Sequence, residues 1–319
     1  MAERNDMAIM KLAPACKDYI WGGNKLINFY NKKYSGNRLA ETWEVSCHDD
    51  GPSIIAEGDH AGESLKDYIN EEGISVLGSD CERFADFPRL VKLIDARDNL
   101  SIQVHPGDEY ARKNEGQNGK TEMWYICECD EGAFLYYGFN RQVDDEEFKR
   151  RIRENTLPEV LNKVRVKKGD VFFIKSGTIH AIGAGILVAE IQQNSNVTYR
   201  VYDYGRKDKD GNERELHIDK ALEVTDKRKM EATDSFEPHI AQCEYFTVDK
   251  IYLDGKFTKS IKGYAGKESF VSILVLDGEG TISQSGKSLG FKKGDSIFIS
   301  AGSGDYEIEG MLEGLMTRV

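Results

Sequence analysis

Four side chains in the first two-thirds of the chain are of types that bind divalent metals, namely Gln103, His105, Glu122 and His180. Two imidazoles and one carboxylate, with a position left for water or substrate, are typical of a catalytic zinc site. The amide of Gln103 is a less usual ligand, which would bind through its carbonyl oxygen. The combination predicts one Zn²⁺ per chain.

Strands must bring these four residues together. Side chains alternate along a β-strand, so Ser101, Gln103 and His105 share one face of the segment 101–105. Lys120 and Glu122 share a face of a second strand in the same way. The metal ligands are therefore expected to point into a β-sheet protein from separate strands.

Basic residues lie near the same strands, at Lys92, Lys120, Arg200 and Arg206. Arginine donates in pairs from a planar fork and lysine supplies a point charge, so both side chains bind phosphate. The whole chain carries a net charge of −12, which argues against nucleic acid and anionic membranes as partners. A local basic cluster in such a chain indicates a small phosphorylated substrate.

Most of the chain is predicted to form β-strands. The strand segments are short, rich in β-branched and aromatic residues, and bounded by Gly, Asp and Asn. Helices are expected at 64–73, 144–164 (interrupted by Pro158) and 217–229. The segment 106–119 is expected to be a loop that turns the chain back.

The segment 166–180, VKKGDVFFIKSGTIH, is similar to 291–305, FKKGDSIFISAGSGD. Each predicts a Gly-Asp turn, an apolar strand and a second turn. Self-similarity of this size indicates two copies of one barrel unit. We expect residues 1–230 to form the metal-binding unit, with a short helical insertion near 144–164. Residues 231–319 should form a unit without metal ligands, because Asp305 stands where the first copy has His180.

Five segments resemble type I mannose-6-phosphate isomerases of the shorter bacterial form. They are DYIWGG (18–23), ETWEVS (41–46), LSIQVHPGDEYA (100–111), GKTEMWYI (119–126) and SGTIHAIGAGILVAEIQQNSNVTYRVYDYGR (176–206). The resemblance covers residues 10–206, with a vaguer cupin-like remainder. It implies a mostly β fold of tandem cupin-type double-stranded β-helix (jelly-roll) units with a small helical part.

The resemblance also implies roles for site residues. It implies that zinc is held by the four residues named first and that Arg200 is the active-site arginine. Five further residues fall where such enzymes line the sugar-phosphate pocket: Lys92, Ser101, Lys120, Glu190 and Arg206. Arg206 would take the place of a lysine found in other members.

The implied reaction interconverts mannose 6-phosphate and fructose 6-phosphate by moving a proton between C2 and C1 through an enediol. Zinc would act as a Lewis acid on the developing oxygen charge, and Arg200 would add a fixed cation. The base that moves the proton is left open between Glu190, Lys120 and a zinc-bound water.

Three other functions remain open. They are a cupin isomerase for another sugar phosphate such as glucose 6-phosphate, a metal-dependent cupin oxygenase, and a non-catalytic sugar-phosphate-binding cupin. An amide ligand and a basic pocket count against the oxygenase. No apolar run approaches the ~20 residues of a membrane span, and the six scattered cysteines are expected to be reduced. The expectation is a cytoplasmic protein, as a monomer or weak homodimer.

Overall fold

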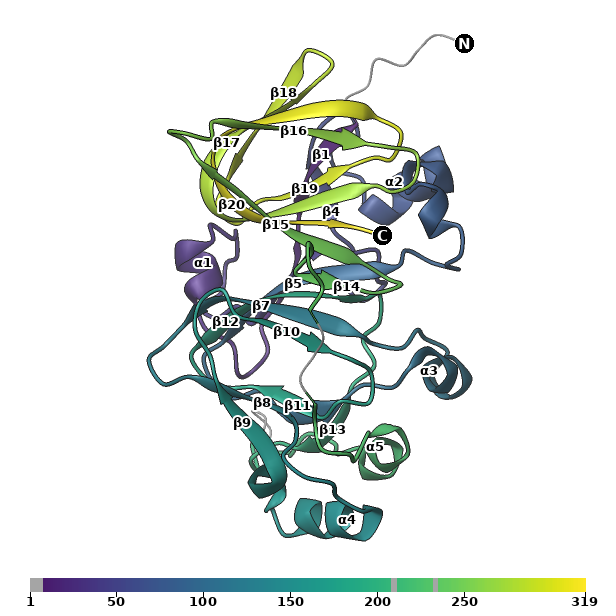
Figure 1. Cartoon of the computed structure of the whole chain (residues 1–319), viewed down its shortest axis with the longest axis vertical. Helices are drawn as coiled ribbons and strands as arrows, with labels where there is room; N and C mark the ends of the chain where they lie inside the picture. The colour runs from purple at the N-terminus through teal and green to yellow at the C-terminus, as the bar shows by residue number, and fades with distance from the viewer. Residues whose placement is uncertain (1–7, 208–210, 232–234) are drawn as a thin grey trace.

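The computed structural model describes residues 8–207, 211–231 and 235–319. Antiparallel strands form three sheets that follow one another along the long axis of the molecule (Figure 1). We call them the C-terminal sheet, the middle sheet and the lower sheet, in the order from the top of the figure. The prediction of a mostly β chain is confirmed.

The middle and lower sheets enclose the first barrel. The middle sheet has six strands in the order β10 (Val171–Ile174), β7 (Glu122–Cys129), β12 (Ile186–Gln193), β5 (Arg89–Ala96), β3 (Glu41–Val45) and β2 (Ala15–Lys17). The lower sheet has five strands in the order β13 (Tyr199–Tyr202), β6 (Ile102–Val104), β11 (His180–Ile182), β8 (Phe134–Phe139) and β9 (Leu161–Arg165). Trp124 and Val188 of the middle sheet pack with Leu135 and Ile182 of the lower sheet in one apolar cluster.

The C-terminal sheet has nine strands. Seven follow the order β14 (Ala241–Gln242), β15 (Thr247–Asp254), β20 (Gly304–Arg318), β17 (Val271–Gln284), β19 (Ser296–Ile299), β1 (Ile9–Ala13) and β4 (Ile54–Glu57). The remaining two are β16 (Ser260–Ala265), which pairs with β20, and β18 (Lys287–Lys292), which pairs with β17. The division of the chain at residue 230 stays a prediction, and the hydrogen bonds of this sheet join strands from both sides of it.

The similarity between residues 166–180 and 291–305 corresponds to two equivalent turns. Asp170 accepts a hydrogen bond from the backbone three residues earlier at 2.9 Å, and Asp295 does the same at 3.0 Å. Gly169 and Gly294 both adopt a positive φ, of 91° and 90°, which a residue with a side chain rarely takes. Each turn leads into a short buried strand, β10 or β19.

The helices are short and lie outside the sheets. They are α1 (Lys25–Phe29), α2 (Leu65–Glu72), α3 (Asp108–Glu115), α4 (Asp145–Arg153) and α5 (Ile218–Val224), with 3-10 turns η1 (Ile74–Val76), η2 (Ser79–Cys81) and η3 (Leu157–Val160). The helix expected over 144–164 ends at Arg153, and its remainder becomes η3, which contains Pro158, and then β9. Among the described residues, every helix is too short or too polar to span a lipid bilayer.

The expectation of a plain loop at 106–119 was wrong, because α3 lies within it. Acidic residues Asp108 and Glu109 begin the helix and basic residues Arg112 and Lys113 end it, as the helix dipole favours. Asp108 also pairs with Arg112 one turn later, at 3.1 Å. Strand and turn signals on both sides concealed this short helical pattern.

Helices cover the outer face of the lower sheet. Ile102 and Val104 of β6 pack in one cluster with Phe148 of α4 and Leu222 of α5. The alternate residues of the same segment therefore face the inside of the barrel. This confirms that Gln103 and its neighbours on that face are available for a site.

The middle sheet is covered on both faces. Leu187, Ala189 and Ile191 of β12 pack in one cluster with Leu274 and Phe298 of the C-terminal sheet. The alternate residues of β12, including Glu190, face into the first barrel. The apolar face thus attaches the second unit, and the opposite face can carry polar groups.

Glu44 lies buried between the two units and provides a test of their attachment. Its carboxylate is 2.6 Å from the Lys32 ammonium and accepts from the Ser296 hydroxyl at 2.8 Å. Glu44→Ala leaves the buried ammonium without its carboxylate, so we expect it to lower the free energy of unfolding by about 3–5 kcal/mol in urea denaturation. The control Glu57→Ala breaks an exposed pair with Lys11 and should cost less than about 1 kcal/mol. Equal losses would contradict the interpretation.

Candidate active site

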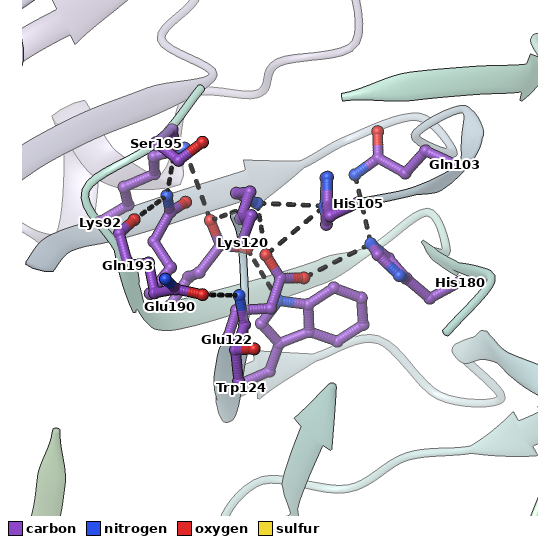
Figure 2. Close-up of polar contacts among 12 residues, drawn as sticks. Lys92, Gln103, His105, Lys120, Glu122, Trp124, His180, Glu190, Gln193 and Ser195 are labelled. Atoms are coloured by element: carbon purple, nitrogen blue, oxygen red, sulfur yellow. Dashed lines mark hydrogen bonds and ion pairs between the residues drawn. The ribbon is translucent and has the colours of Figure 1, made fainter. Parts of the chain in front are cut away.

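The structure brings three of the predicted metal ligands into one buried cluster. Ligand atoms of His105, Glu122 and His180 all lie within 4.8 Å of one another. Glu122 on β7 lies between the two imidazoles, 3.6 Å from Nε2 of His105 and 3.4 Å from Nε2 of His180 (Figure 2). The middle sheet supplies the carboxylate, and the region of β6 and β11 in the lower sheet supplies the imidazoles.

Backbone carbonyls orient both imidazoles. Nδ1 of His105 lies 2.8 Å from the carbonyl oxygen of Val197, and Nδ1 of His180 lies 2.9 Å from that of Thr178. A carbonyl oxygen can only accept, so each Nδ1 carries the proton and each Nε2 keeps its lone pair. Both lone pairs are on the side of Glu122, as metal-binding histidines require.

Burial sets the protonation of the cluster. It lowers the pKa of His105 well below its ordinary value and that of His180 to about 4. Burial, together with the nearby carboxylate of Glu190, raises the pKa of Glu122 to about 7. One oxygen of Glu122, Oε1, is buried without a hydrogen-bond partner among the described residues. Neutral imidazoles and an unsatisfied carboxylate oxygen fit a bound cation.

Gln103 lies next to this cluster. It stands opposite His180 across β6 and β11, and its amide nitrogen is 3.4 Å from Nε2 of that imidazole. Its amide oxygen accepts from the Ser101 hydroxyl at 3.4 Å. A half turn of the amide exchanges the two atoms and places the carbonyl oxygen toward the cluster. Gln103 is therefore adjacent to the cluster through His180.

A row of alternating charges extends from the cluster across the middle sheet. Lys120 donates a short hydrogen bond to Glu122, and its ammonium is 3.6 Å from Glu190. Lys92 lies 3.5 Å from Glu190 on its other side and 3.6 Å from Glu41. We call Glu41, Lys92, Glu190, Lys120 and Glu122 the charge row, and all five are buried.

The charge row keeps Glu190 ionised. Burial raises the pKa of this carboxyl. The ammonium groups of Lys120 and Lys92 and the indole of Trp124 lower the pKa by more than burial raises it, so the net shift is downward. The indole Nε1 donates to Glu190 at 2.8 Å (Figure 2). Burial likewise lowers the pKa of Lys92, yet the carboxylates of Glu41 and Glu190 raise it above its ordinary value. Glu190 is thus a carboxylate able to accept a proton.

The backbone around Lys120 is fixed by two side chains. Asp108 accepts from the backbone N–H of Gly119 at 2.7 Å, and Gln193 accepts from that of Thr121 at 2.8 Å. The amide of Gln193 also donates to Asp108 at 2.9 Å. The helix that sequence reasoning missed, α3, therefore supplies the residue that positions Lys120.

A cavity of about 280 Å³ opens beside the cluster. Six predicted site residues line it: Lys92, Ser101, Gln103, Lys120, Glu190 and Arg200. It is also lined by polar and aromatic residues that sequence reasoning did not assign: Tyr19, Trp21, Glu41, Asn196, Thr198 and Arg214. The segment ETWEVS contained a signal for Glu41, whereas Arg214 lies beyond the last segment that carried the resemblance.

Arg206 does not line this cavity. Its guanidinium binds the carboxylate of Asp203 and the carbonyl oxygen of Asn99, beside a separate cavity of about 330 Å³. A regular strand through both residues would place Arg200 and Arg206 on the same face, because they are an even number of residues apart. Strand β13 ends at Tyr202, and Tyr204 then adopts a positive φ of 60°, which turns the chain away.

Two β-barrel units, with a buried His–Glu–His cluster beside a cavity that lysine and arginine side chains help to line, define a cupin protein able to hold a metal. A family profile described as phosphomannose isomerase type I, catalytic domain, matches residues 9–131. A second, described as mannose-6-phosphate isomerase, cupin domain, matches residues 237–319. The chain belongs to the type I mannose-6-phosphate isomerase family.

Relatives match over nearly the whole chain. Mannose-6-phosphate isomerase ManA of Bacillus subtilis is 38% identical, over 96% of this chain and 97% of its own. The mannose-6-phosphate isomerase of Streptococcus mutans is 35% identical, over 92% of this chain and 93% of its own. The crystal structure of a mannose 6-phosphate isomerase from B. subtilis superposes with a TM-score of 0.89 at 34% identity, covering 98% of this chain and 99% of that one.

Gly119 tests how tightly the backbone beside Lys120 is packed. A Cβ at this position would lie 2.5 Å from the backbone nitrogen of Asp108 and 2.6 Å from the carbonyl carbon of Gly107. Gly119→Ala should therefore force the backbone apart and lower the free energy of unfolding by about 1–3 kcal/mol. Gly107→Ala is the control, since its nearest neighbour is the side chain of Ser176 at 3.3 Å. The measurement is urea denaturation, and a neutral Gly119→Ala would contradict the packing argument.

Proposed function

We propose that the chain interconverts mannose 6-phosphate and fructose 6-phosphate, using one Zn²⁺ held by Gln103, His105, Glu122 and His180. The observation that carries this proposal is the buried His–Glu–His cluster, whose neighbours Gln103 and Lys120 line a cavity together with Lys92, Arg200 and Arg214. Relatives named mannose-6-phosphate isomerase match the chain over nearly its whole length. The reaction needs a metal for the sugar oxygens and cations for the phosphate.

The donor set supports zinc as the metal. Two neutral imidazoles and a carboxylate are a common ligand set of catalytic zinc. The buried oxygen of Glu122 that has no hydrogen-bond partner would be satisfied by a bound cation. A mannose 6-phosphate isomerase solved with zinc and yttrium bound shares the fold, with a TM-score of 0.73 at 17% identity. When bound, zinc would stabilise negative charge on the substrate oxygens as a Lewis acid.

Arg200 adds a fixed positive charge to the cavity. It stands opposite Gln103 across β13 and β6, and its Nε donates to the hydroxyl of Ser101 at 3.3 Å. This position sets a guanidinium beside the metal ligands. A fixed cation there would stabilise negative charge on the bound substrate without reorganisation during the reaction.

Glu190 is the proposed base. It lines the cavity, and the charge row keeps it ionised at neutral pH. It would take the proton from C2 of the open-chain aldose and return it to C1, while the hydroxyl proton of O2 is lost and O1 gains one. The atoms balance, so no oxidant or reductant is consumed. The ammonium of Lys120 contacts both Glu190 and Glu122 and would offset the repulsion between the two carboxylates. The proposal selects Glu190 from the three candidates that the sequence left open.

A coupled assay for fructose 6-phosphate tests the function. We expect turnover of mannose 6-phosphate, little turnover of glucose 6-phosphate, and loss of activity after chelation that added Zn²⁺ restores. His105→Ala and His180→Ala should lose zinc in metal analysis and at least about 10³-fold in kcat while remaining folded. A variant that keeps zinc at wild-type occupancy would overturn the ligand assignment, and a protein that binds substrate without turnover would indicate a sensor.

Glu190→Gln tests the base. The amide cannot accept the substrate proton, so kcat should fall by about 10²- to 10⁴-fold. Zinc content should stay unchanged, because the substitution preserves the side-chain shape and the contact with Trp124. Exchange of the C2 hydrogen with D₂O, followed by NMR, should slow by the same factor. Glu279→Gln on the exposed surface of β17 is the matched control. If Lys120→Met abolishes exchange while Glu190→Gln leaves it intact, the base assignment is wrong.

A further inference from the structure

Arg214 reaches the substrate cavity from a segment outside the predicted site. The segment 214–217 runs beside β13 and is bonded to it. The backbone of His217 donates to the Arg200 carbonyl at 2.8 Å, and Nη1 of Arg200 donates to the Glu215 carbonyl at 3.0 Å. These hydrogen bonds fix the position of the segment that carries Arg214 relative to Arg200, beside the cavity.

Asp203 binds two arginines at once. Arg214 donates to its two oxygens at 2.7 and 2.6 Å. Arg206 donates to the same carboxylate through Nε and Nη2, and its Nη1 donates to the carbonyl of Asn99. All three nitrogens of Arg206 therefore have a protein partner, and its side chain does not line the substrate cavity.

Arg200 and Arg214 each keep one terminal nitrogen for a ligand. Nη2 of Arg200 and Nη1 of Arg214 have no hydrogen-bond partner among the described residues, and neither is among the buried polar atoms without a partner. Both nitrogens are thus open to solvent, and both residues line the cavity. Two guanidinium donors of this kind are the usual means of binding a phosphate.

The charges at this end of the cavity match a phosphate ester. Arg200, Arg206 and Arg214 with Asp203 leave a net of two positive charges, and a phosphate monoester carries about −1.5 to −2 at neutral pH. Burial lowers the pKa of Arg200, and the neighbouring charge of Arg214 lowers it further. An anion between the two guanidinium groups would relieve this repulsion.

We propose that the substrate phosphate binds between Arg200 and Arg214, and that Arg206 is a positioning residue that holds Asp203. This inference rests on the proposed function, because it assigns one end of that substrate. It differs from the expectation that Arg206 binds the phosphate itself.

Binding of inorganic phosphate, measured by calorimetry on the zinc-loaded protein, tests the subsite without catalysis. Arg214→Met should weaken phosphate binding by about 10- to 100-fold and raise KM for mannose 6-phosphate by a similar factor, with kcat changed little. Arg214→Lys keeps the positive charge but loses the forked pair of donors. Its phosphate affinity and KM should lie between those of the wild type and of Arg214→Met. Arg228→Met, at a side chain 82% exposed, is the control.

Arg206 should behave as a positioning residue. Arg206→Met should weaken phosphate binding by only about 3- to 10-fold, and Arg206→Lys, which can still pair with Asp203, should restore most of it. Circular dichroism and the urea midpoint check that each variant folds.

Two results would overturn the proposal. One is phosphate binding and KM that stay at wild-type values in a folded Arg214→Met or Arg214→Lys, which would make Arg214 only an ion-pair partner of Asp203. The other is a larger loss in Arg206→Met than in Arg214→Met. A wild-type protein that binds phosphate through Arg214 but does not isomerise mannose 6-phosphate would refute the proposed function and leave the subsite standing.

Discussion

The burial of Glu122 between two imidazoles is the constraint on which the site depends. A carboxylate removed from water loses far more solvation energy than one hydrogen bond returns. Here burial raises its pKa, one of its oxygens has no hydrogen-bond partner, and Lys120 supplies the nearest positive charge. Because both imidazoles are neutral, they cannot balance the carboxylate but can share a cation with it. The two sheets of the first barrel must therefore stay in close register, since the carboxylate and imidazoles come from opposite sheets.

The second unit supports that register. The C-terminal sheet covers the apolar face of the middle sheet, so the residues of the charge row can all lie on the other face. Arg89 of β5 donates to Ser272 and to the carbonyl of Thr317 in the C-terminal sheet, and Tyr245 donates to Asp108 at 3.0 Å. Asp108 in turn fixes the backbone beside Lys120. A unit that places Asp305 on its exposed surface thus acts on the site through packing and hydrogen bonds.

The cavity has two electrically distinct ends. Three carboxylates and two lysines form the charge row beside the metal ligands, and the balance there is negative, as a divalent cation requires. Arg200 and Arg214 line the other end, where Asp203 pairs with Arg214 and Arg206, and the balance is positive. A sugar phosphate with its carbonyl end at the metal and its phosphate at the arginines would satisfy both ends. The overall charge of −12 therefore does not prevent an anionic substrate from binding.

Side-chain alternation and residue type were enough to single out His105, Glu122 and His180, which the structure brings together, and to place Gln103 on the same strand face as His105. Their binding of a metal stays a prediction. The β architecture and the repeated Gly-Asp turn followed from the same local patterns, and these depend on neighbours in sequence. Only the tertiary structure decided the rest. Helix α3 was concealed by its short length, and the C-terminal sheet took up β1 and β4 through long-range pairing. The change of direction after Tyr202 left Arg206 outside the cavity, which Arg214 lines from a later segment. Such features depend on backbone turns and contacts between distant segments, which alternation along a single strand does not encode.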